Sequence, residues 1–522
     1  MYILEYIKNL YVDLNPVMIF PFITGLYLIL FFNYYIKSLQ PTPDTAEWIE
    51  MEKETPKLSF LTGRHPMTKN DVVPLIILTA IFLFLATFNL GDTNIVDITN
   101  EIQSPSENRT HLDNIYFDEI YFVRTAVEHI ENLHPYEISH PPLGKEIIAA
   151  SILTFGMSPL GWRLLGAIIG VLMLVVMYIF IKNMFGKTII AVCGTLLLGF
   201  DFMRFVQTRI ATIDTYAVTF ILLTFFFMYR YITTDPDAEF RKSLAPLALS
   251  GIFFGLGFAT KWIGFYAGAG VFVLYVIRLF QLGLHYSTTE KPDFGKYLIK
   301  TLLYSFLFFV IIPVIVYYLT YIPYGYARGW SLGGGMLWDT DYFNLVWSNQ
   351  VSMFTYHSRL VAEHPFSSVW WQWIFNIRPI LYVNNYLGDA RAAFGAFGNP
   401  VVWWGGLLAV IMAVFRVFTH RDEKALIIVI GYLSQLLPWV AVTRIVFAYH
   451  YFSSTLFLVL ALALVFDTII ERQKNNAGKY AVFGYTVVTG TIFAIFFPML
   501  SGMYIPRWYY SSFIKWFHTW PF

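Results

Sequence analysis

Residues 161–203 read GWRLLGAIIGVLMLVVMYIFIKNMFGKTIIAVCGTLLLGFDFM and contain two apolar runs separated by a short link. The first run, 161–181, is long enough to cross a bilayer as a helix, because about 20 apolar residues span the hydrocarbon core. The second run, 188–203, is predicted to cross back. The link between them carries Lys182 and Lys187. The stretch therefore predicts two membrane-spanning helices joined on one side of a membrane.

The composition of the whole chain agrees with this local pattern. Its 522 residues are 57% hydrophobic, 19% aromatic and 13% charged, and its mean hydropathy is +0.57. Because a soluble domain carries about 25% charged residues, we exclude a soluble globular enzyme. The 35 Lys and Arg nearly balance the 34 Asp and Glu, so no net charge indicates a nucleic-acid partner. Cys193 is the only cysteine, which excludes an internal disulfide and a multi-cysteine metal site.

Twelve apolar runs predict an all-α polytopic membrane protein. We interpret the first run as an uncleaved helix and not as a signal peptide, because aromatic residues crowd its ends and no small-residue cleavage site follows. The predicted spans are 16–34, 73–90, 161–181, 188–203, 210–229, 245–260, 262–277, 301–320, 401–415, 425–440, 451–468 and 481–497.

The distribution of Lys and Arg between the loops predicts the orientation of the chain. Basic residues are retained on the cytoplasmic side of a membrane. Twenty of the 35 Lys and Arg lie in the segments 35–72, 182–187, 230–244, 278–300, 416–424 and 469–480. Both termini and two long loops, 91–160 and 321–400, are therefore predicted outside the cytoplasm.

This topology divides the chain into four regions. An extra helix and a cytoplasmic linker occupy 1–72, and a catalytic membrane region with the first external loop occupies 73–320. The second long external loop, 321–400, precedes C-terminal helices and an external tail at 401–522. Loops held by a rigid scaffold often carry the chemistry of a protein, so the functional site is sought in the two long loops.

Two adjacent carboxylates, Asp118 and Glu119, lie in the first loop at the start of a predicted amphipathic helix. They could cap that helix, which stabilises its dipole by about 0.3–1 kcal/mol, or they could perform acid–base chemistry. A second helix is predicted to begin in HPPLGK at 140–145. Its free N–H groups and Lys145 suit a lipid-linked phosphate, although Lys145 could equally reach the membrane surface as an interfacial lysine.

Further ionisable residues lie at the outer ends of the predicted spans. Arg163 begins one span and could bind phosphate or simply face the interface. Arg209 and Asp214 are expected to form an ion pair that holds helices together, because charges near a bilayer are costly unless they are paired. Lys261 lies at another outer boundary and has the same two interpretations.

These motifs, taken in order, resemble the protein O-mannosyltransferase family of the glycosyltransferase C superfamily. The second long loop is too short for the β-rich domain of eukaryotic members, so the chain is similar to the shorter prokaryotic type. The resemblance covers roughly residues 75–470 and rests on Phe117-Asp118-Glu119, HPPLGK at 140–145, Trp162-Arg163, QTRIATID at 207–214, ATKWIGFY at 259–266, Tyr356-His357-Ser358, HPFSSVWWQW at 364–373 and RIVFAYHY at 444–451.

The resemblance implies a glycosyltransferase C bundle of about 12 transmembrane helices in the cell membrane, with an extracytoplasmic active site. It also implies inverting transfer of a sugar, typically mannose, from a polyprenyl or dolichyl phosphate to Ser or Thr hydroxyls of exported polypeptides. Asp118 is then expected to accept the hydroxyl proton, and Glu119 to support it. The expected donor-phosphate ligands are Arg163, Lys145, His140 and Arg209, and the expected acceptor or sugar contacts are His357, His364, Ser367, Tyr449 and His450.

Two other functions stay open at the level of sequence. A related enzyme could transfer a lipid-linked sugar to a lipid or a glycan, because the scaffold would be nearly identical. A polyprenyl-sugar transporter is disfavoured, since transporters bind ligands near the membrane midplane and these charged clusters gather at one face. The expected partners are the donor lipid and the acceptor polypeptide, with the secretion translocon as a further candidate. No cofactor or protein metal site is expected, although a divalent cation between phosphate and Asp118 or Glu119 stays open.

Overall fold

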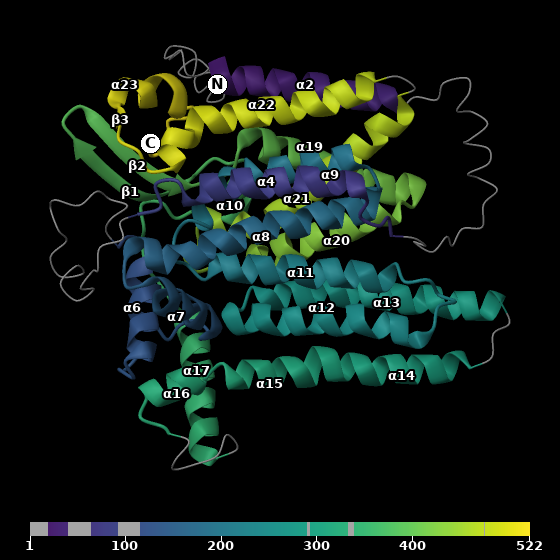
Figure 1. Cartoon of the computed structure of the whole chain (residues 1–522), viewed down its shortest axis with the longest axis horizontal. Helices are drawn as coiled ribbons and strands as arrows, with labels where there is room; N and C mark the ends of the chain where they lie inside the picture. The colour runs from purple at the N-terminus through teal and green to yellow at the C-terminus, as the bar shows by residue number, and fades with distance from the viewer. Residues whose placement is uncertain (1–18, 40–63, 92–114, 290–292, 332–338, 474–475) are drawn as a thin grey trace, which may run out of the picture.

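Long helices lie side by side in a bundle, and shorter helices and a small sheet gather at one end of it (Figure 1). The computed structural model describes residues 19–39, 64–91, 115–289, 293–331, 339–473 and 476–522. Within these ranges eleven helical stretches are long and apolar enough to cross a membrane, and α9 (Thr188–Gly199) is a shorter apolar helix. The architecture of the described chain is therefore that of a polytopic helical membrane protein.

The eleven long stretches include helices that run on into one another. They are α2 (Ile19–Ser38), α4 (Lys69–Thr87), α8 (Pro159–Phe185), α11 (Asp214–Ile232), α12 (Phe240–Thr260), α13 (Gly264–Thr288), α14 to α16 (Phe294–Phe306, π-helical η3 at Leu307–Ile311, Ile312–Leu319, Ile322–Ala327), α19 (Pro400–His420), α20 with η4 (Glu423–Leu436, Leu437–Ala441), η5 with α21 (Ala448–Tyr451, Phe452–Arg472) and α22 (Ala477–Leu500).

Each of the twelve predicted spans falls on one of these stretches or on α9, so the predicted helical bundle is confirmed. Residues 16–18 of the first predicted span lie outside the described residues. The fourth span is shorter than predicted, because α9 ends at Gly199 and a turn at Phe200 and Asp201 separates it from the six-residue α10 (Phe202–Gln207).

Helix α21 lies at the centre of the bundle. It packs against α9, α19, α20 and α22, and every residue from Phe452 to Ile469 is buried. Its sequence is apolar on all sides, with Asp467 as the one charged residue in that stretch, and a helix of this kind is stable only when it is surrounded. The distribution of hydropathy along α21 therefore accounts for its central position.

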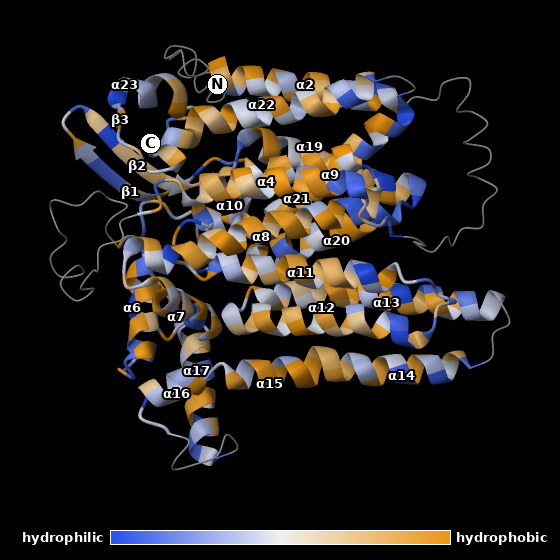
Figure 2. Cartoon of the chain, viewed as in Figure 1, coloured by the Kyte–Doolittle hydropathy of each residue, from blue (hydrophilic) through white to orange (hydrophobic). Residues whose placement is uncertain are grey.

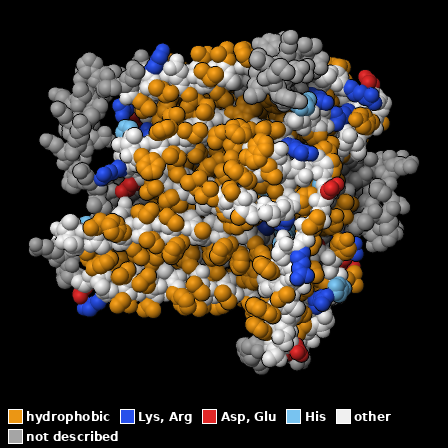
Figure 3. All heavy atoms as spheres, turned by 180° about the vertical axis from the view of Figure 1, so that it is seen from behind, with side chains coloured by type: hydrophobic (Ala, Val, Ile, Leu, Met, Phe, Trp, Pro, Cys, Tyr) orange, Lys and Arg blue, Asp and Glu red, His pale blue; other side chains and the backbone are white. Residues whose placement is uncertain are grey.

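Hydrophobic side chains cover the length of the helices, and polar residues gather at the two ends of the bundle (Figure 2). The opposite face of the molecule carries a broad hydrophobic surface over the helices (Figure 3). Large hydrophobic side chains of the long helices, such as Phe272, Phe280 and Val314, are exposed. Exposure of such a large hydrophobic surface to water would be unfavourable. It is expected of helices that face lipid.

The two long loops meet at one end of the bundle, where α6 and α17 run across the ends of the long helices (Figure 1). The first loop forms α6 (Glu119–Ile130) and α7 (Leu143–Phe155), and the second forms α17 (Thr340–Arg359) and α18 (Trp370–Ile374). Both loops therefore contribute to one polar surface at this end of the bundle.

A three-stranded antiparallel sheet at the same end was not among the elements predicted from the sequence. Its order is β1 (Ile380–Leu387), β2 (Ala390–Ala396) and β3 (Ile505–Pro506), and Gly388, with a φ of 58°, forms the tight turn between the first two strands. The α23 (Arg507–Tyr509) and η6 (Tyr510–Ile514) turns follow β3. The sheet brings the C-terminal tail against the second long loop.

Candidate active site

Asp118 lies directly before α6, at the end of the bundle where the two loops meet. The preceding residue, Phe117, has a φ of 53°, which is an unfavourable backbone conformation for an aromatic residue. Although Asp118 occupies the N-cap position of α6, its carboxylate makes no capping hydrogen bond and no other polar contact with a described residue. The interpretation that Asp118 merely caps this helix is therefore wrong.

The environment of Asp118 favours the protonated form of its carboxyl group. Burial raises the pKa of Asp118 to about 7, and the positive charge of Lys261 opposes this rise. The negative charges of Asp214 and Glu137 raise the pKa further. A carboxyl group with a pKa near neutrality can both accept and release a proton under physiological conditions.

Glu119 points away from this environment and forms a buried ion pair with Arg163. The Nε and Nη2 atoms of Arg163 each donate to one oxygen of Glu119, at 2.8 Å. Glu119 also accepts from the N–H of Ala211, and Arg163 donates to the carbonyl of Leu90. Loss of one partner of such a fully buried pair costs about 3–5 kcal/mol. This pair connects α6 to α8 and holds Asp118 at the start of its helix.

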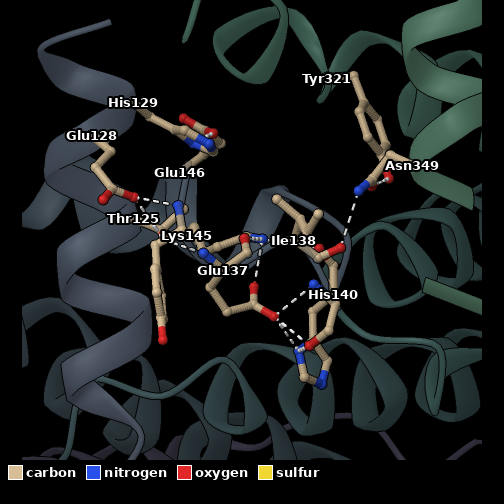
Figure 4. A network of polar contacts seen from close by, with 12 residues as sticks. Thr125, Glu128, His129, Glu137, Ile138, His140, Lys145, Glu146, Tyr321 and Asn349 are labelled. Atoms are coloured by element: carbon tan, nitrogen blue, oxygen red, sulfur yellow. Dashed lines mark hydrogen bonds and ion pairs between the residues drawn. The ribbon is translucent and has the colours of Figure 1, made fainter. Parts of the chain in front are cut away.

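Lys145 lies in a closed network with Glu137 and His140 (Figure 4). Its amino group donates to a carboxylate oxygen of Glu137 at 2.7 Å, and to the carbonyls of Glu137 and His140 at 2.9 Å each. These three acceptors use all three donors of a lysine. Although burial opposes it, the charge of Lys145 and the hydrogen bonds from His140 and Lys145 hold the pKa of Glu137 well below its usual range.

Helix α17 anchors the same loop from the other side. Asn349 donates to the carbonyl of Ile138, as Figure 4 shows, and His357 Nε2 donates to the carbonyl of Ser139 at 2.8 Å. Burial, together with the positive charge of Arg444, lowers the pKa of His357 to about 4. His357 is therefore neutral at physiological pH, and its buried Nδ1 is an acceptor without a described partner.

The predicted ion pair between Arg209 and Asp214 is not formed. Asp214 instead binds Lys261, with 2.8 Å between the Lys261 amino group and a carboxylate oxygen. Arg209 donates to the carbonyls of Phe88 and Asn89 from the end of α4. Sequence proximity suggested the wrong partner, because Lys261 reaches Asp214 from the end of another helix.

A cavity of about 490 Å³ opens beside these groups, and the two long loops share its walls with the ends of α12, α13 and η4. Lys261 and Arg444 are the two cationic groups in its lining, and Lys261 is the one paired with Asp214. The aromatic rings of Trp262, Tyr266 and Trp439 line it too. The full lining is Ser139, His140, Pro141, Lys261, Trp262, Ile263, Tyr266, Phe354, His357, Ser358, Leu360, Val361, Trp439, Ala441, Val442, Thr443, Arg444 and His450.

Arg444 differs from the other arginines near this site because it has no acidic partner among the described residues. It is half-buried, and within the described chain its side chain donates only to the carbonyl of the neighbouring Ile445. A guanidinium on a cavity wall with most of its donors unused can bind a phosphate or carboxylate.

Asp118 is connected to this cavity through Lys261 and to the sheet through Phe117. The amino group of Lys261 lies 5.3 Å from the ring centre of Tyr449, and the ring of Phe117 lies 5.9 Å from that same ring. On its other side Phe117 stacks on Tyr382 of β1, with 3.9 Å between ring centres. The arrangement can hold an anionic group in the cavity and accept a proton at its margin.

Two family models account for most of the chain. One, described as dolichyl-phosphate-mannose-protein mannosyltransferase, matches residues 108–324, and the other, described as the C-terminal four TMM region of protein-O-mannosyltransferase, matches residues 342–520. The chain belongs to the protein O-mannosyltransferase family. Every group described above lies within these two ranges apart from Leu90, Phe88 and Asn89, which end α4.

Bacterial relatives extend this match over most of their own length. The chain is 25% identical to the polyprenol-phosphate-mannose--protein mannosyltransferase of Mycobacterium tuberculosis over 449 residues, which cover 75% of this chain and 84% of the relative. It is 27% identical to the enzyme of that name from Mycolicibacterium smegmatis over 416 residues, 71% of this chain and 80% of the relative.

The fold agrees with that of a solved family structure. The structure of the Saccharomyces cerevisiae Pmt1-Pmt2 complex bound to the sugar donor matches with a TM-score of 0.72 at 13% sequence identity, over 88% of this chain and 93% of the compared chain. The predicted glycosyltransferase C fold class is thereby confirmed.

The predicted phosphate ligands of this protein O-mannosyltransferase do not form one group. His140 lines the cavity, but Arg163, Lys145 and Arg209 have their side chains in the buried contacts described above. The sequence did not indicate the phosphate-ligand candidate Arg444, although the motif RIVFAYHY begins with it. Attention to an arginine ahead of the predicted span 451–468 could have found it.

The predicted acceptor and sugar contacts are also divided. His357 and His450 line the cavity, and Tyr449 lies behind it against Lys261. His364 and Ser367 do not line it, and the ring of His364 packs against Phe447. No group of three or more potential metal ligands is found among the residues that the structure describes.

Proposed function

We propose that this chain transfers mannose from a polyprenyl or dolichyl phosphate to Ser or Thr hydroxyls of exported polypeptides, with inversion at the sugar carbon. The observation that carries the proposal is the half-buried carboxyl group of Asp118, which has no partner among the described residues and lies near a cavity with two cations, Lys261 and Arg444. Membership of the protein O-mannosyltransferase family and the names of the mycobacterial relatives support it.

In this mechanism Asp118 accepts the proton of the acceptor hydroxyl. The hydroxyl oxygen forms a bond to the anomeric carbon of mannose while the bond from that carbon to the phosphate oxygen breaks on the opposite face. The electrons of the broken bond leave with the polyprenyl phosphate, which needs no proton because it is a stable anion. A general base of this kind contributes about 10²–10⁴-fold to a rate.

Arg444 and Lys261 are proposed to hold the donor phosphate. The donor phosphodiester carries one negative charge, and the departing monoester gains a second as the sugar acquires positive charge. Fixed cations in a partly enclosed cavity stabilise the charge that develops in the transition state more than the charge of the bound donor. The charge of Lys261 also stabilises the ionised form of Asp118. One side chain would therefore act on both the base and the departing phosphate.

The neutral histidines of the cavity suit the sugar. Burial lowers the pKa of His140, as it does that of His357. The free Nδ1 of His357 can accept a hydrogen bond from a sugar hydroxyl, and the nearby rings of Trp262 and Trp439 offer apolar faces to the pyranose. A cavity of 490 Å³ lies in the range of small-molecule binding sites, about 300–1,000 Å³.

The site is proposed to face the extracytoplasmic side of the cell membrane. The loops that form it belong to the set with few Lys and Arg, whereas the basic segments, such as 416–424, lie between other helix ends. An acceptor that has just crossed the membrane would reach the site in an unfolded state, so the secretion translocon stays a candidate partner.

The decisive experiment measures mannose transfer in liposomes that contain polyprenyl-phosphate mannose and a Ser/Thr peptide. Asp118→Asn should lose about 100-fold or more of the transfer rate and still bind the donor, because only the base is removed. Asp341→Asn is the matched control, since Asp341 is an exposed carboxylate on α17 with no part in the cavity.

Unchanged transfer by Asp118→Asn would contradict the role of Asp118 as the base. If the wild type is inactive toward the peptide and active toward a lipid or glycan acceptor, the chain is a related transferase and the proposed acceptor is wrong. We also propose that no cofactor is required, so transfer should persist after treatment with EDTA. Loss of activity that added Mg²⁺ or Mn²⁺ restores would contradict this part of the proposal.

A further inference from the structure

The first strand of the sheet, β1, has a free edge. The sheet order is β1-β2-β3, so β1 pairs with another described strand on one side only. Leu387 pairs with Ala390 across the two-residue turn, and Tyr386 pairs with Arg391. In an antiparallel hairpin, pairs that exchange hydrogen bonds alternate with pairs whose N–H and C=O groups point outward. The register therefore directs the backbone groups of Tyr386 and Asn384 to the free edge.

An independent contact supports this register. The N–H of Ala393, the residue opposite Asn384, donates to the hydroxyl of Tyr510 at 2.8 Å, on the side of β2 that faces away from β1. Ala393 and Asn384 thus form an outward-facing pair. The outward N–H and C=O groups of Asn384 and Tyr386 form no hydrogen bond within the part of the chain that the structure describes.

This edge lacks the usual protection against pairing with other strands. Edge strands in soluble proteins commonly carry Lys, Pro or an inward-pointing charge that prevents the addition of a further strand. The β1 sequence, ILYVNNYL, contains none of these, and its last four residues, 384–387, are all exposed. Tyr386 and Leu387 are large and apolar enough to be unfavourable in water. The edge has the properties of a surface that another extended chain covers.

The free edge leads directly to Asp118. Tyr382 lies two residues before Asn384 and stacks on Phe117, which precedes Asp118 in the chain. Two residues of a strand span about 7 Å. The hydroxyl of Tyr382 donates to Gln207, so this end of β1 is fixed to the bundle while residues 384–387 extend away from it. If another polypeptide paired with residues 384–387 of β1, the residues that follow its paired segment would lie near Asp118, the proposed catalytic base.

We propose that the acceptor polypeptide binds as an added strand along the free edge of β1, and that the pairing delivers its Ser or Thr hydroxyl to Asp118. This inference rests on the proposed function, because it names how the acceptor of that reaction is held. An irregularity in the β1 register between Leu381 and Val383 interrupts the regular alternation at Tyr382, before pairing resumes at Leu381, so an acceptor on the free edge could turn toward Asp118 at this point.

Strand addition explains how one site could accept many sequences. Hydrogen bonds from the main chain of β1 to the main chain of the acceptor supply affinity that does not depend on acceptor side chains. It also requires an extended acceptor, which an exported polypeptide is before it folds. The donor occupies the cavity lined by Lys261 and Arg444, and no residue of β1 lines that cavity.

The test is a substitution that removes one outward N–H group of β1 and retains the fold. Tyr386→Pro removes the outward donor of Tyr386, and proline is tolerated on an edge strand whose N–H faces outward. Tyr386→Ala is the matched control, because it removes the ring and keeps the N–H. The KM for a Ser/Thr peptide should rise about threefold to tenfold in Tyr386→Pro relative to Tyr386→Ala, the effect of one lost hydrogen bond. The KM for polyprenyl-phosphate mannose should not change.

A peptide series gives a second readout that does not depend on a variant of the protein. Acceptor peptides carrying a single N-methyl group at successive positions remove one backbone donor at a time. Strand pairing predicts that KM rises at every second position on one side of the modified Ser or Thr, because only alternate N–H groups face β1.

The outcomes separate this inference from the proposed function. If the wild type transfers mannose to the peptide while Tyr386→Pro matches Tyr386→Ala and N-methylation shows no alternation, the strand-addition inference is wrong and the proposed function stands. If the wild type transfers no mannose to any peptide but does modify a lipid or glycan, both are wrong.

Discussion

Asp118 is distinguished from neighbouring acids by what its carboxylate does not contact. Glu119 is bound to Arg163, Glu137 to Lys145 and Asp214 to Lys261. Each of these pairs offsets the cost of burial of its charged groups. The carboxylate of Asp118 has no such partner among the described residues, and its pKa is raised. At the scale of the residue, the proposed base is thus the acid whose carboxylate has no ion-pair partner in the described structure.

The raised pKa of Asp118 predicts a pH dependence of transfer. The base must be ionised, and its pKa of about 7 means that it becomes protonated as the pH falls through 7. We expect kcat/KM to be constant above about pH 8 and to fall about tenfold per pH unit well below pH 7. His357, with a pKa of about 4, is neutral over this pH range, so its titration does not cause the same fall in kcat/KM. A profile that stays flat down to about pH 5 would contradict the assignment.

Arg444 gives a second prediction at this scale. Arg444→Gln keeps some hydrogen-bonding ability and removes the charge, so the KM for the donor should rise and kcat should fall, because the cation is proposed to stabilise both bound and departing phosphate. We expect a loss of about tenfold to a hundredfold in kcat/KM, the effect of about 1.4–3 kcal/mol. Arg421→Gln, at the C-terminal end of α19 and away from the cavity, is the control. A donor KM equal to that of the control would exclude a phosphate contact.

The elements that matter most for the site are α12 and α13, because the short turn between them carries Lys261 and Trp262 to the cavity. Their close approach depends on Gly264. A Cβ atom at Gly264 would lie 2.5 Å from the carbonyl carbon of Gly257 and 2.6 Å from the N atom of Phe258. Backbone atoms cannot move aside as a flexible side chain can, so any residue larger than glycine must separate the two helices.

Gly264→Ala is therefore expected to destabilise the protein by about 1–3 kcal/mol and to reduce transfer, because Lys261 would move with the start of α13. Thermal unfolding in detergent and the transfer assay measure these two effects. Gly295→Ala in α14 is the matched control, since no atom lies within 4 Å of a Cβ built there. A Gly264→Ala protein as stable and active as this control would show that the contact is not required.

At the scale of the whole molecule, the bundle separates two polar ends. One end carries the cavity, Asp118 and the sheet, and the other carries ion pairs such as Lys187 with Asp467 and Glu471. The charge distribution between loops predicts that the first end faces outward. Since Cys193 is buried and is the only cysteine, the chain is suited to a labelling test of this orientation.

In a Cys193→Ala background, Asp389→Cys at the hairpin turn should react with a membrane-impermeant maleimide on intact cells. Glu471→Cys should react only after the membrane is permeabilised. The native side chains at these two positions are 88% and 60% exposed, so access is limited by the membrane and not by burial in the protein. The reverse pattern of labelling would place the proposed site in the cytoplasm and contradict the orientation.

The sequence by itself determined the twelve apolar helices, the two long loops and the resemblance that led to Asp118, because these depend on run length, charge placement and local motifs. Only the tertiary structure decided which charges are partners. Arg163 meets Glu119 across 44 positions, and Lys261 meets Asp214 across 47. Arg444 reaches the cavity from the far end of the chain, and β1 acquires its free edge only when the hairpin folds. Helix formation depends on nearby residues, whereas ion pairing depends on distances that packing alone sets.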